Sequence, residues 1–317
     1  MAIKAAVVQA EPEWLDLQSS VEKTCVMIAE AATNGAKIIA FPELWIPGYP
    51  GWIWARPVDF ELNIEYTKNS LVVDSEEMRR LCECAAENSI VVCLGFSERS
   101  GGSLYIAQCL IGEEGHLLMT RRKLKPVHME RTIFGDANGS SLLNVVPASV
   151  GRVGALSCGE HFQPLLKYHT FSQQEEIHVS AWPPVVPFTG GVAPFSMSKE
   201  AAEQASRIYS IESQTFTLHS TNIIGERGIE KLRTQQAPIF NIVGGGAAAV
   251  FGPDGRKLSN ELPGTVEGLV YAYLDFDQIL KEKALLDSCG HNSRPDLLWL
   301  GVNTDDQKPV RSKHLLD

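Results

Sequence analysis

The feature that most constrains the fold of this chain is a short apolar run that ends in a cysteine and a glycine. Residues 153–157 (Val-Gly-Ala-Leu-Ser) have the length of a buried strand, and Cys158 and Gly159 follow directly. Beyond them, apolar residues recur at roughly helical spacing at Phe162, Leu165, Leu166 and Tyr168. A cysteine on such a strand-to-helix turn projects above a sheet, where the amides of the first helical turn favour its thiolate and an anion formed during attack. Cys158 is therefore a candidate nucleophile; the alternative is that it is one more small buried hydrophobe, the commonest role of a free cysteine.

The N-terminal part of the chain predicts a β-α-β unit. Residues 3–9 are expected to form a strand, residues 19–35 a helix that begins near a capping serine and stops at a glycine, and residues 36–41 a second buried strand. This alternation favours the α/β class.

The rest of the chain continues the alternation, with hairpins mixed in. Helices are expected over residues 75–88, 160–169, 197–212 and 277–287, and strands over 90–96, 103–111, 117–122, 142–146, 153–157, 177–182, 215–220, 247–251 and 268–274. The last two strands are expected to form a hairpin, and residues 222–245 to be irregular. A purely parallel sheet is therefore not expected. No linker or shift in composition divides the chain, which indicates a single domain over residues 1–301 and a C-terminal tail over residues 302–317.

Composition argues against several classes of protein. The 317 residues are 44% hydrophobic and 21% charged, which is typical of a soluble globular protein. A net charge of -10, with no basic cluster longer than residues 121–125, argues against a nucleic-acid partner. No run approaches the ~18 apolar residues of a membrane span, and the N-terminus lacks the pattern of a signal peptide. Seven cysteines, an odd number, favour a reducing, cytoplasmic setting, and Cys82 and Cys84 lack the second pair that a zinc site needs.

Three polar residues of different chemistry stand at the ends of strand-like runs. Glu43 follows residues 38–41, while Lys123 and Cys158 follow the runs that end at residues 122 and 157. Strand ends are where ligands and catalytic groups gather in α/β sheets. A thiol needs a base for its proton and a fixed cation for the charge that develops during attack, and a carboxylate and an ammonium supply these roles. Taken singly, Glu43 has a structural explanation as a loop carboxylate or helix cap, Lys123 as an exposed strand end, and Glu130 as a surface charge.

Three sequence blocks together resemble the signature blocks of the nitrilase superfamily, in the same order and at similar spacing. They are Phe41-Pro42-Glu43-Leu44-Trp45, then Arg121-Arg122-Lys123-Leu124-Lys125-Pro126 with Glu130 beyond it, and Ser157-Cys158-Gly159-Glu160-His161. The resemblance runs from Ile3 to about Gly301 and includes residues 181–183 and 290–296. Within the superfamily it is strongest to the nitrilase branch, especially the fungal-type enzymes that act on aryl-acetonitriles.

The resemblance implies a four-layer αββα sandwich with mixed sheets, a homodimer formed across its helices, and larger or spiral homo-oligomers. It implies that Cys158 is the nucleophile, Glu43 the general base, Lys123 the stabiliser of the tetrahedral intermediate, and Glu130 an auxiliary carboxylate. The implied substrate is a small-molecule nitrile of the arylaliphatic class, hydrolysed to the carboxylic acid and ammonia with some amide as by-product. No cofactor and no metal are implied. The residues expected to border the substrate are Gly159, His161, Trp182, Trp52 and His128.

One residue departs from the nitrilase pattern. Nitrilases usually carry Trp directly after the nucleophile, where this chain has Gly159. An aromatic side chain occupies ~150 to 250 Å² of contact surface, so its loss removes much of one pocket wall. We expect a wider pocket that accepts bulkier nitriles, and a more flexible turn because glycine samples more backbone states. The alternative is that neighbouring aromatics, Trp52 or Trp182, fill the gap.

Three other functions are weighed against a nitrilase. A cyanide hydratase or dihydratase resembles the same blocks, but so small a substrate gains little from a wide pocket. An amidase of the superfamily would work through a thioester without the first hydration, and the Glu160-His161 context resembles nitrilases better. A non-catalytic scaffold that keeps the fold for filament assembly is disfavoured by the intact set of Glu43, Lys123 and Cys158.

Overall fold

The side chains of strand β1 (Ala2–Ala10) alternate between two apolar cores, and this alternation explains the layers of the protein. The computed structural model describes residues 2–305 and 310. Ala6 and Val8 pack with helices α1 (Leu17–Thr33) and α3 (Glu76–Asn88), whereas Ala5 and Val7 belong to a core formed between strands. Because successive side chains of a strand point to opposite faces, the sheet around β1 has helices on one side and a second sheet layer on the other.

The strands form one hydrogen-bonded path in the order β5-β4-β3-β2-β1-β9-β8-β7-β6. Their bounds are β2 (Ile38–Ala40), β3 (Val91–Ser100), β4 (Ser103–Ile111), β5 (Leu117–Arg122), β6 (Val145–Ala148), β7 (Gly151–Ser157), β8 (Ile177–Trp182) and β9 (Phe216–Asn222). Strand β11 (Gly268–Asp275) pairs antiparallel with β1, and β10 (Ala249–Phe251) pairs antiparallel with β9. The central pairs, such as β1 with β2 and β7 with β8, are parallel, and the pairs at both ends are antiparallel. The prediction of a mixed sheet is confirmed.

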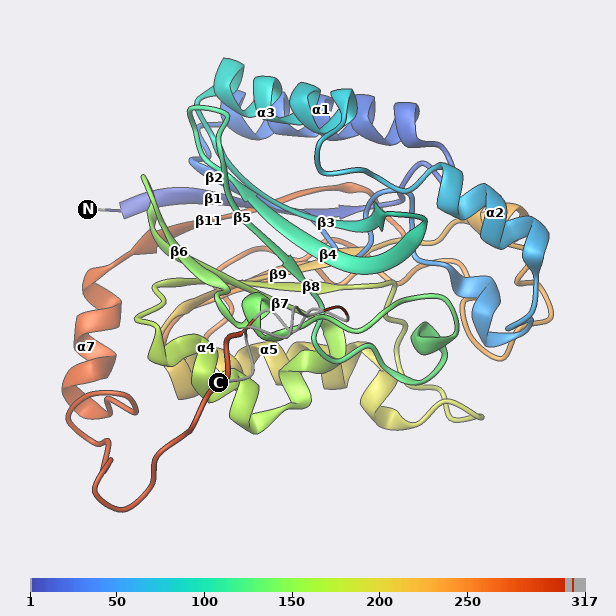
Figure 1. Ribbon diagram of the computed structural model, residues 1–317. Coiled ribbons are helices and arrows are strands. Elements are labelled where there is room, and N and C mark those ends of the chain that lie inside the picture. The colour runs from blue at the N-terminus through green and yellow to red at the C-terminus, as the bar shows by residue number, and fades with distance from the viewer. Residues whose placement is uncertain (1, 306–309, 311–317) are drawn as a thin grey trace.

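Helices α4 (Pro164–Ser172) and α5 (Lys199–Ser213) cover the outer face of the second sheet layer, opposite α1 and α3 (Figure 1). Leu156 of β7 packs there against Leu166 and Phe171 of α4 and Tyr209 of α5. The order of layers is therefore helix, sheet, sheet, helix, which confirms the predicted αββα architecture. The remaining helices, α2 (Phe60–Lys68), α6 (Glu226–Lys231) and α7 (Asp277–Leu285), lie outside these layers.

The long helices α1, α3 and α5 begin at capping side chains, but the cap of α1 is Asp16 and not the serine expected near residue 19, so this helix begins at Leu17. The side chain of Asp16 accepts a hydrogen bond from the amide of Ser19 at the start of α1, and Ser75 and Ser198 cap α3 and α5 in the same way. Each cap satisfies an amide that the helix itself leaves without a partner.

Four expectations about local structure require correction. The predicted hairpin of residues 247–251 and 268–274 is wrong, because β10 and β11 pair with β9 and β1 instead. The helix predicted over residues 160–169 is divided into a 3-10 turn (Cys158–Phe162) and α4, because Pro164 has no N–H to donate and starts a new helix. Residues 222–245 contain α6, and the strand expected over residues 142–146 begins at Val145. Alternating hydrophobicity predicts that a strand exists but does not reveal its partner.

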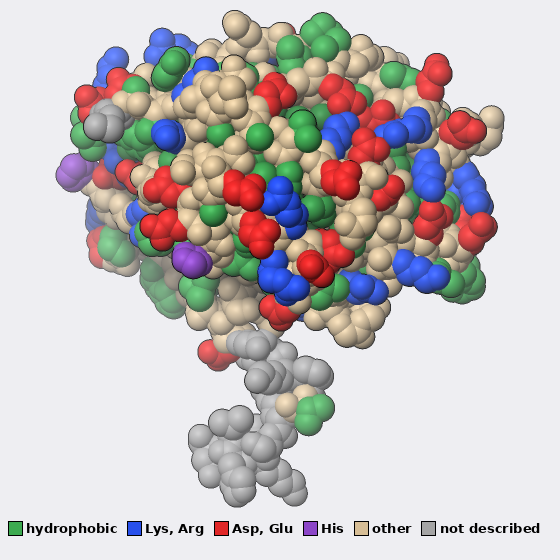
Figure 2. Space-filling model, turned by 90° about the horizontal axis from the view of Figure 1, so that it is seen from above, with side chains coloured by type: hydrophobic (Ala, Val, Ile, Leu, Met, Phe, Trp, Pro, Cys, Tyr) green, Lys and Arg blue, Asp and Glu red, His purple; other side chains and the backbone are tan. Residues whose placement is uncertain are grey.

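The surface and the C-terminus add two observations. In Figure 2, acidic and basic side chains of the described residues are interspersed over the face that α1 and α3 cover. Within the described part of the chain, no helix is both long and apolar enough to cross a membrane. Of the predicted tail, residues 306–309 and 311–317 lie outside the described residues.

Candidate functional site

Glu43, Lys123 and Glu130 form a buried ionic group, which we call the charged cluster. The ammonium of Lys123 donates to Glu43 Oε1 at 2.7 Å and to Glu130 Oε2 at 2.8 Å. Lys123 follows β5 directly, Glu43 follows β2, and Glu130 lies on a 3-10 turn (His128–Thr132) seven residues after the lysine. All three side chains are at most 1% exposed, so the ion pairs are shielded from water. The structure thus brings together three of the residues that the sequence singled out.

The charged cluster and Cys158 influence one another electrostatically. Burial raises the pKa of Glu43 to about 8, and the charge of Lys123 opposes this effect. Burial disfavours the ammonium of Lys123, but Glu130 and Glu43 together raise its pKa above the ordinary value. Burial also raises the pKa of the Cys158 thiol well above its usual value, and Glu43 adds to the effect while Lys123 counteracts it. The thiol therefore starts protonated at neutral pH and needs a nearby base.

One oxygen of Glu43 is free to act on a proton. Glu43 Oε1 accepts from Lys123, whereas Oε2 is buried and has no hydrogen-bond partner among the described residues. Buried carboxylate oxygens are normally satisfied, so this one is available to a proton donor that enters the site. A carboxyl group whose pKa lies near neutrality is also well matched to general-base catalysis.

The backbone at Cys158 is in an unusual conformation. Its φ angle is 45°, in the left-handed region that residues with a side chain adopt rarely. Ser157 ends β7 in an extended conformation, and the 3-10 turn begins at Cys158. A residue held in this region costs of order 1–3 kcal/mol and persists only where its surroundings enforce it. The turn is thus a strained elbow that presents the thiol beyond the end of the strand.

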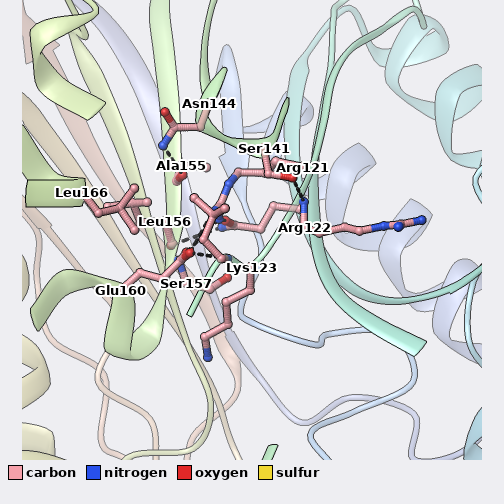
Figure 3. Close-up of polar contacts among 12 residues, drawn as sticks. Arg121, Arg122, Lys123, Ser141, Asn144, Ala155, Leu156, Ser157, Glu160 and Leu166 are labelled. Atoms are coloured by element: carbon pink, nitrogen blue, oxygen red, sulfur yellow. Dashed lines mark hydrogen bonds and ion pairs between the residues drawn. The ribbon is translucent and has the colours of Figure 1, made fainter. Parts of the chain in front are cut away.

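Glu160 ties this elbow to the segment that carries Lys123 (Figure 3). Its carboxylate accepts from the amide of Ser157 at 3.0 Å and from the amide of Leu124 at 2.8 Å, and it forms a bidentate ion pair with Arg121, both contacts at 2.8 Å. Burial opposes the charge of Glu160, but Arg121 lowers its pKa below the ordinary value. Arg121 also donates to Gln108 on the neighbouring strand. The nucleophile candidate and the lysine therefore belong to one rigid hydrogen-bonded unit.

A cavity of about 660 Å³ opens beside Cys158 and Glu130. Its wall is mostly apolar and aromatic, and includes Tyr49, Trp54, Val127, His128, Gly159, Phe162, Trp182, Ile239 and Phe240. Apolar walls with a few converging polar groups are typical of small-molecule sites. Of the residues expected to border the substrate, Gly159, Trp182 and His128 line this cavity.

Trp52 and His161 lie elsewhere. The ring of Trp52 is buried against Tyr66, at 5.2 Å between ring centroids, in a hydrophobic cluster behind the cavity wall. His161 lies beneath the elbow, stacked on Trp182 at 5.3 Å. Neither residue lines the cavity. Trp52 therefore does not fill the space beside Gly159, as one alternative had supposed.

Sequence reasoning missed Tyr49 and Trp54. Tyr49 donates to Glu130 Oε1 at 3.3 Å, and the indole N–H of Trp54 donates to the Tyr49 hydroxyl at 3.2 Å. Trp54 also stacks on His128 with 5.3 Å between ring centroids. Both belong to residues 46–56, a segment rich in Pro, Gly and Trp, and such a composition does not indicate which of the rings face a cavity.

Gly159 has open space on one side and a close neighbour on the other. A Cβ atom added to it would lie 2.8 Å from Val127 Cγ1, so any side chain here displaces Val127. Among the described residues, no group of three or more His, Cys, Asp or Glu side chains is arranged to hold a metal ion.

Comparison with known proteins places this geometry in a family. The sequence pattern of the carbon-nitrogen hydrolase family matches residues 4–281. An arylacetonitrilase from Aspergillus kawachii is 57% identical over 98% of this chain and 94% of its own length, and one from Aspergillus niger is 56% identical with the same coverage. An arylacetonitrilase from Hypocrea virens is 55% identical.

Solved structures show the same fold at low sequence identity. A carbon-nitrogen hydrolase from Helicobacter pylori superposes with a TM-score of 0.72 at 17% identity, covering 93% of this chain and 97% of that one. An amidase from Nesterenkonia, as a double mutant in complex with acrylamide, superposes with a TM-score of 0.62 at 19% identity, covering 90% and 95%.

Proposed function

The chain belongs to the carbon-nitrogen hydrolase family, and from that premise we propose that it is a nitrilase that hydrolyses arylaliphatic nitriles to carboxylic acids and ammonia. The similarity to arylacetonitrilases over nearly the whole chain supports a nitrilase rather than a cyanide hydratase or an amidase. The structural observation that carries the proposal is a strained cysteine beside a buried Glu-Lys-Glu cluster at the edge of an apolar, aromatic cavity. An aromatic ring attached to a nitrile suits such a wall.

In the mechanism that we propose, Cys158 is the nucleophile. The free oxygen of Glu43 accepts the thiol proton as sulfur attacks the nitrile carbon, and Glu43 passes this proton to the nitrile nitrogen, which gives a covalent thioimidate and restores the carboxylate. The ammonium of Lys123 stabilises negative charge on the reacting atoms, and Glu130 holds Lys123 in place. The short contacts of Lys123 with both carboxylates support these roles.

Water then completes the reaction in two steps. A first water, activated by Glu43, adds to the thioimidate and gives a tetrahedral intermediate. Expulsion of ammonia leaves a thioester, and a second water hydrolyses the thioester to the acid and restores the thiol. If the thiolate leaves instead of ammonia, the product is the amide. A change of about 1.4 kcal/mol in the difference between the activation free energies for loss of ammonia and loss of the thiolate changes the acid-to-amide ratio tenfold.

The setting that we propose is a single domain over residues 1–301 in a cytoplasmic homo-oligomer. Seven free cysteines support a reducing compartment. Apolar side chains exposed on the helix layer of α4 and α5, including Leu165 at 70% and Ile208 at 45%, support a homodimer across these helices that builds larger or spiral assemblies. Size-exclusion chromatography with light scattering tests the assembly, and a monomer at micromolar concentration would contradict it.

The function is tested by product analysis. Purified protein is given phenylacetonitrile, a short aliphatic nitrile, cyanide and phenylacetamide, and acid, amide and ammonia are measured together, with C158A as control. We expect acid and ammonia from phenylacetonitrile, lost in the variant. Turnover confined to cyanide would make the protein a cyanide hydratase, and turnover confined to phenylacetamide would make it an amidase.

A further inference from the structure

A second polar group lies beneath the elbow, on the side away from the charged cluster. His161 Nδ1 contacts the carbonyl oxygen of Cys158 at 2.9 Å, and His161 Nε2 contacts His178 Nε2 at 2.9 Å. His178 Nδ1 contacts Glu175 Oε1 at 2.7 Å, and the Tyr209 hydroxyl donates to Glu175 Oε2 at 2.6 Å. We call these four residues the histidine chain. All of them are at most 3% exposed, so water does not compete for their hydrogen bonds.

The direction of every hydrogen bond in this chain follows from its first contact. A backbone carbonyl only accepts, so His161 Nδ1 carries a hydrogen. Burial lowers the pKa of His161 well below its ordinary value, so the ring is neutral and its Nε2 accepts from His178. The second ring nitrogen of His178 then faces a carboxyl oxygen of Glu175, and this contact requires one proton shared between the two groups.

Removal of that shared proton reverses the whole chain. His178 would donate from Nδ1 to an ionised Glu175, and its Nε2 would become an acceptor. His161 would have to donate from Nε2, which leaves the lone pair of Nδ1 facing the carbonyl of Cys158. The contact that holds the elbow would change from attractive to repulsive.

We propose that His161 is a positioning residue that holds the Cys158 elbow through its carbonyl, and that the proton shared by His178 and Glu175 keeps His161 in the donating tautomer. The inference rests on the proposed function only for its kinetic readout. Its physical basis is the strained φ angle at Cys158, which needs fixed partners to persist.

The fold makes room for the Glu175 carboxyl. A Cβ atom at Gly154, in the middle of β7, would lie 1.9 Å from Glu175 Oε1. Glycine inside a strand is unfavourable relative to alanine, and it marks a place where another group approaches closely. This strand therefore accommodates a buried carboxyl group at some cost in its own stability.

The surroundings favour a neutral pair. Burial raises the pKa of Glu175 to about 8, and the hydrogen bond from Tyr209 opposes the rise. Burial lowers the pKa of His178 well below its ordinary value. The charged and titratable groups that act on the chain are Arg121 from β5, Glu160 from the elbow, Lys167 from α4, Glu212 from α5 and Cys289. Of these, the charges on Arg121 and Lys167 both disfavour a cationic His178.

The experiment uses two substitutions that fix the direction of the chain. In E175Q the amide oxygen takes the place that accepts from Tyr209, so the NH2 group faces His178 Nδ1 and donates at every pH. In H161N the NH2 group of the side-chain amide can donate to the Cys158 carbonyl at every pH, because asparagine has no tautomer in which this group loses its hydrogens. The matched control is H169A, because His169 Nε2 also contacts a backbone carbonyl, that of Leu142, at 2.9 Å, but stands outside the chain.

The first readout is kcat and KM against pH between 6 and 10, with phenylacetonitrile. For the wild type and H169A we expect kcat to fall on the alkaline side, about tenfold per pH unit once the shared proton is lost, with little change in KM. E175Q and H161N should lack this decline. A decline in E175Q that coincides with that of the wild type, or no decline in the wild type, would overturn the inference.

The second readout needs no turnover. Hydrogen exchange of the peptide that covers residues 157–163, corrected for the intrinsic effect of pH, reports opening of the elbow. We expect protection to fall at least about threefold between pH 7 and pH 9 in the wild type and to persist in E175Q. If nitriles are not hydrolysed but this difference is found, the proposed function fails and the positioning role stands. If nitriles are hydrolysed and exchange is the same in both proteins, the positioning role fails.

Discussion

Two buried polar groups border Cys158, and they differ in how their carboxyl groups are kept inside the protein. In the charged cluster, Glu43 and Glu130 share the ammonium of Lys123. In the histidine chain, the partners of the Glu175 carboxyl group among the described residues are a neutral imidazole and a phenol. Burial raises the pKa of Glu43 and of Glu175 to about 8 in each case, but a cation opposes the effect only at Glu43.

The difference teaches what a buried carboxyl group can do. Glu43 keeps one oxygen without a hydrogen-bond partner among the described residues, so this carboxyl group can take a proton from a group that enters the site. Both oxygens of Glu175 are engaged, one by His178 and one by Tyr209, so its proton stays within the histidine chain as a hydrogen-bond donor. One side of the elbow is therefore suited to moving protons during the reaction, and the other to holding a proton still.

The largest effect is expected from removing the cation of the charged cluster. K123A leaves Glu43 and Glu130 in a water-poor site without the cation that they share, and it removes the group that stabilises negative charge. We expect kcat to fall by at least about 10³-fold, and the free energy of unfolding to fall by roughly 3–5 kcal/mol. Steady-state kinetics and denaturant unfolding check both effects, with K125A as control because Lys125 is exposed. Activity within tenfold of the wild type would contradict a role for this cation.

The same chemical change in the two groups is expected to have opposite results. E43Q removes the base, so we expect kcat to fall about 10² to 10⁴-fold at every pH. E175Q supplies a permanent donor to His178, so we expect kcat at pH 7 within about threefold of the wild type. Parallel kinetics on the two purified variants test the comparison. Equal losses in both variants would mean that the two carboxyl groups do not differ in role.

How far the sequence predicts this arrangement depends on whether a residue acts through its local pattern or through a distant contact. The elbow at Cys158 and the positions of Glu43 and Lys123 at strand ends follow from local periodicity, and the structure brings the two side chains into contact. The pairing of β10 and β11 could not be predicted, since apolar alternation is the same for any partner strand. Nor could the contact between His161 and His178, because the two residues lie in different elements that only the folded chain brings together.

A substitution in the cavity wall should leave the charged cluster and the histidine chain intact, so it serves as a reference for the substitutions within these two groups. G159W fills space next to Val127, and we expect the ratio of kcat/KM for a bulky arylaliphatic nitrile to that for a short aliphatic one to fall about tenfold. The pH profile should stay that of the wild type. G159W combined with V127A relieves the close contact with Val127 and should show the same shift in substrate preference. An unchanged preference in both variants would show that the glycine does not widen the pocket.

Removing the phenol of Tyr209, at the end of the histidine chain, should raise the pKa of the Glu175 carboxyl group. The hydrogen bond from Tyr209 favours the ionised form of Glu175 and lowers its pKa. In Y209F the pKa of Glu175 should therefore rise, and the alkaline decline of kcat should move to higher pH by about one unit. The profile is measured with phenylacetonitrile, as for E175Q. A shift of the decline to lower pH, or no shift, would show that ionisation of the histidine chain does not cause the alkaline decline of kcat.

Glu175 should also make stability depend on pH, and the sign of this effect follows from the direction of the pKa shift. The pKa of Glu175 is about 8 in the folded protein and 4.5 for an ordinary glutamate, so between these values the folded state binds more protons than the unfolded state. The stability from this group is fully present below pH 4.5 and is lost as pH rises through 8, at up to about 1.4 kcal/mol per pH unit. E175Q cannot ionise and should lack this contribution. Denaturant unfolding of the wild type and E175Q at pH 5.5, 6.5 and 7.5 measures how the free energy of unfolding of each protein changes with pH. We expect the free energy of unfolding of the wild type, relative to that of E175Q, to fall as the pH rises. Parallel slopes would mean that the folded pair does not hold the shared proton over this pH range, with Glu175 ionised and His178 neutral.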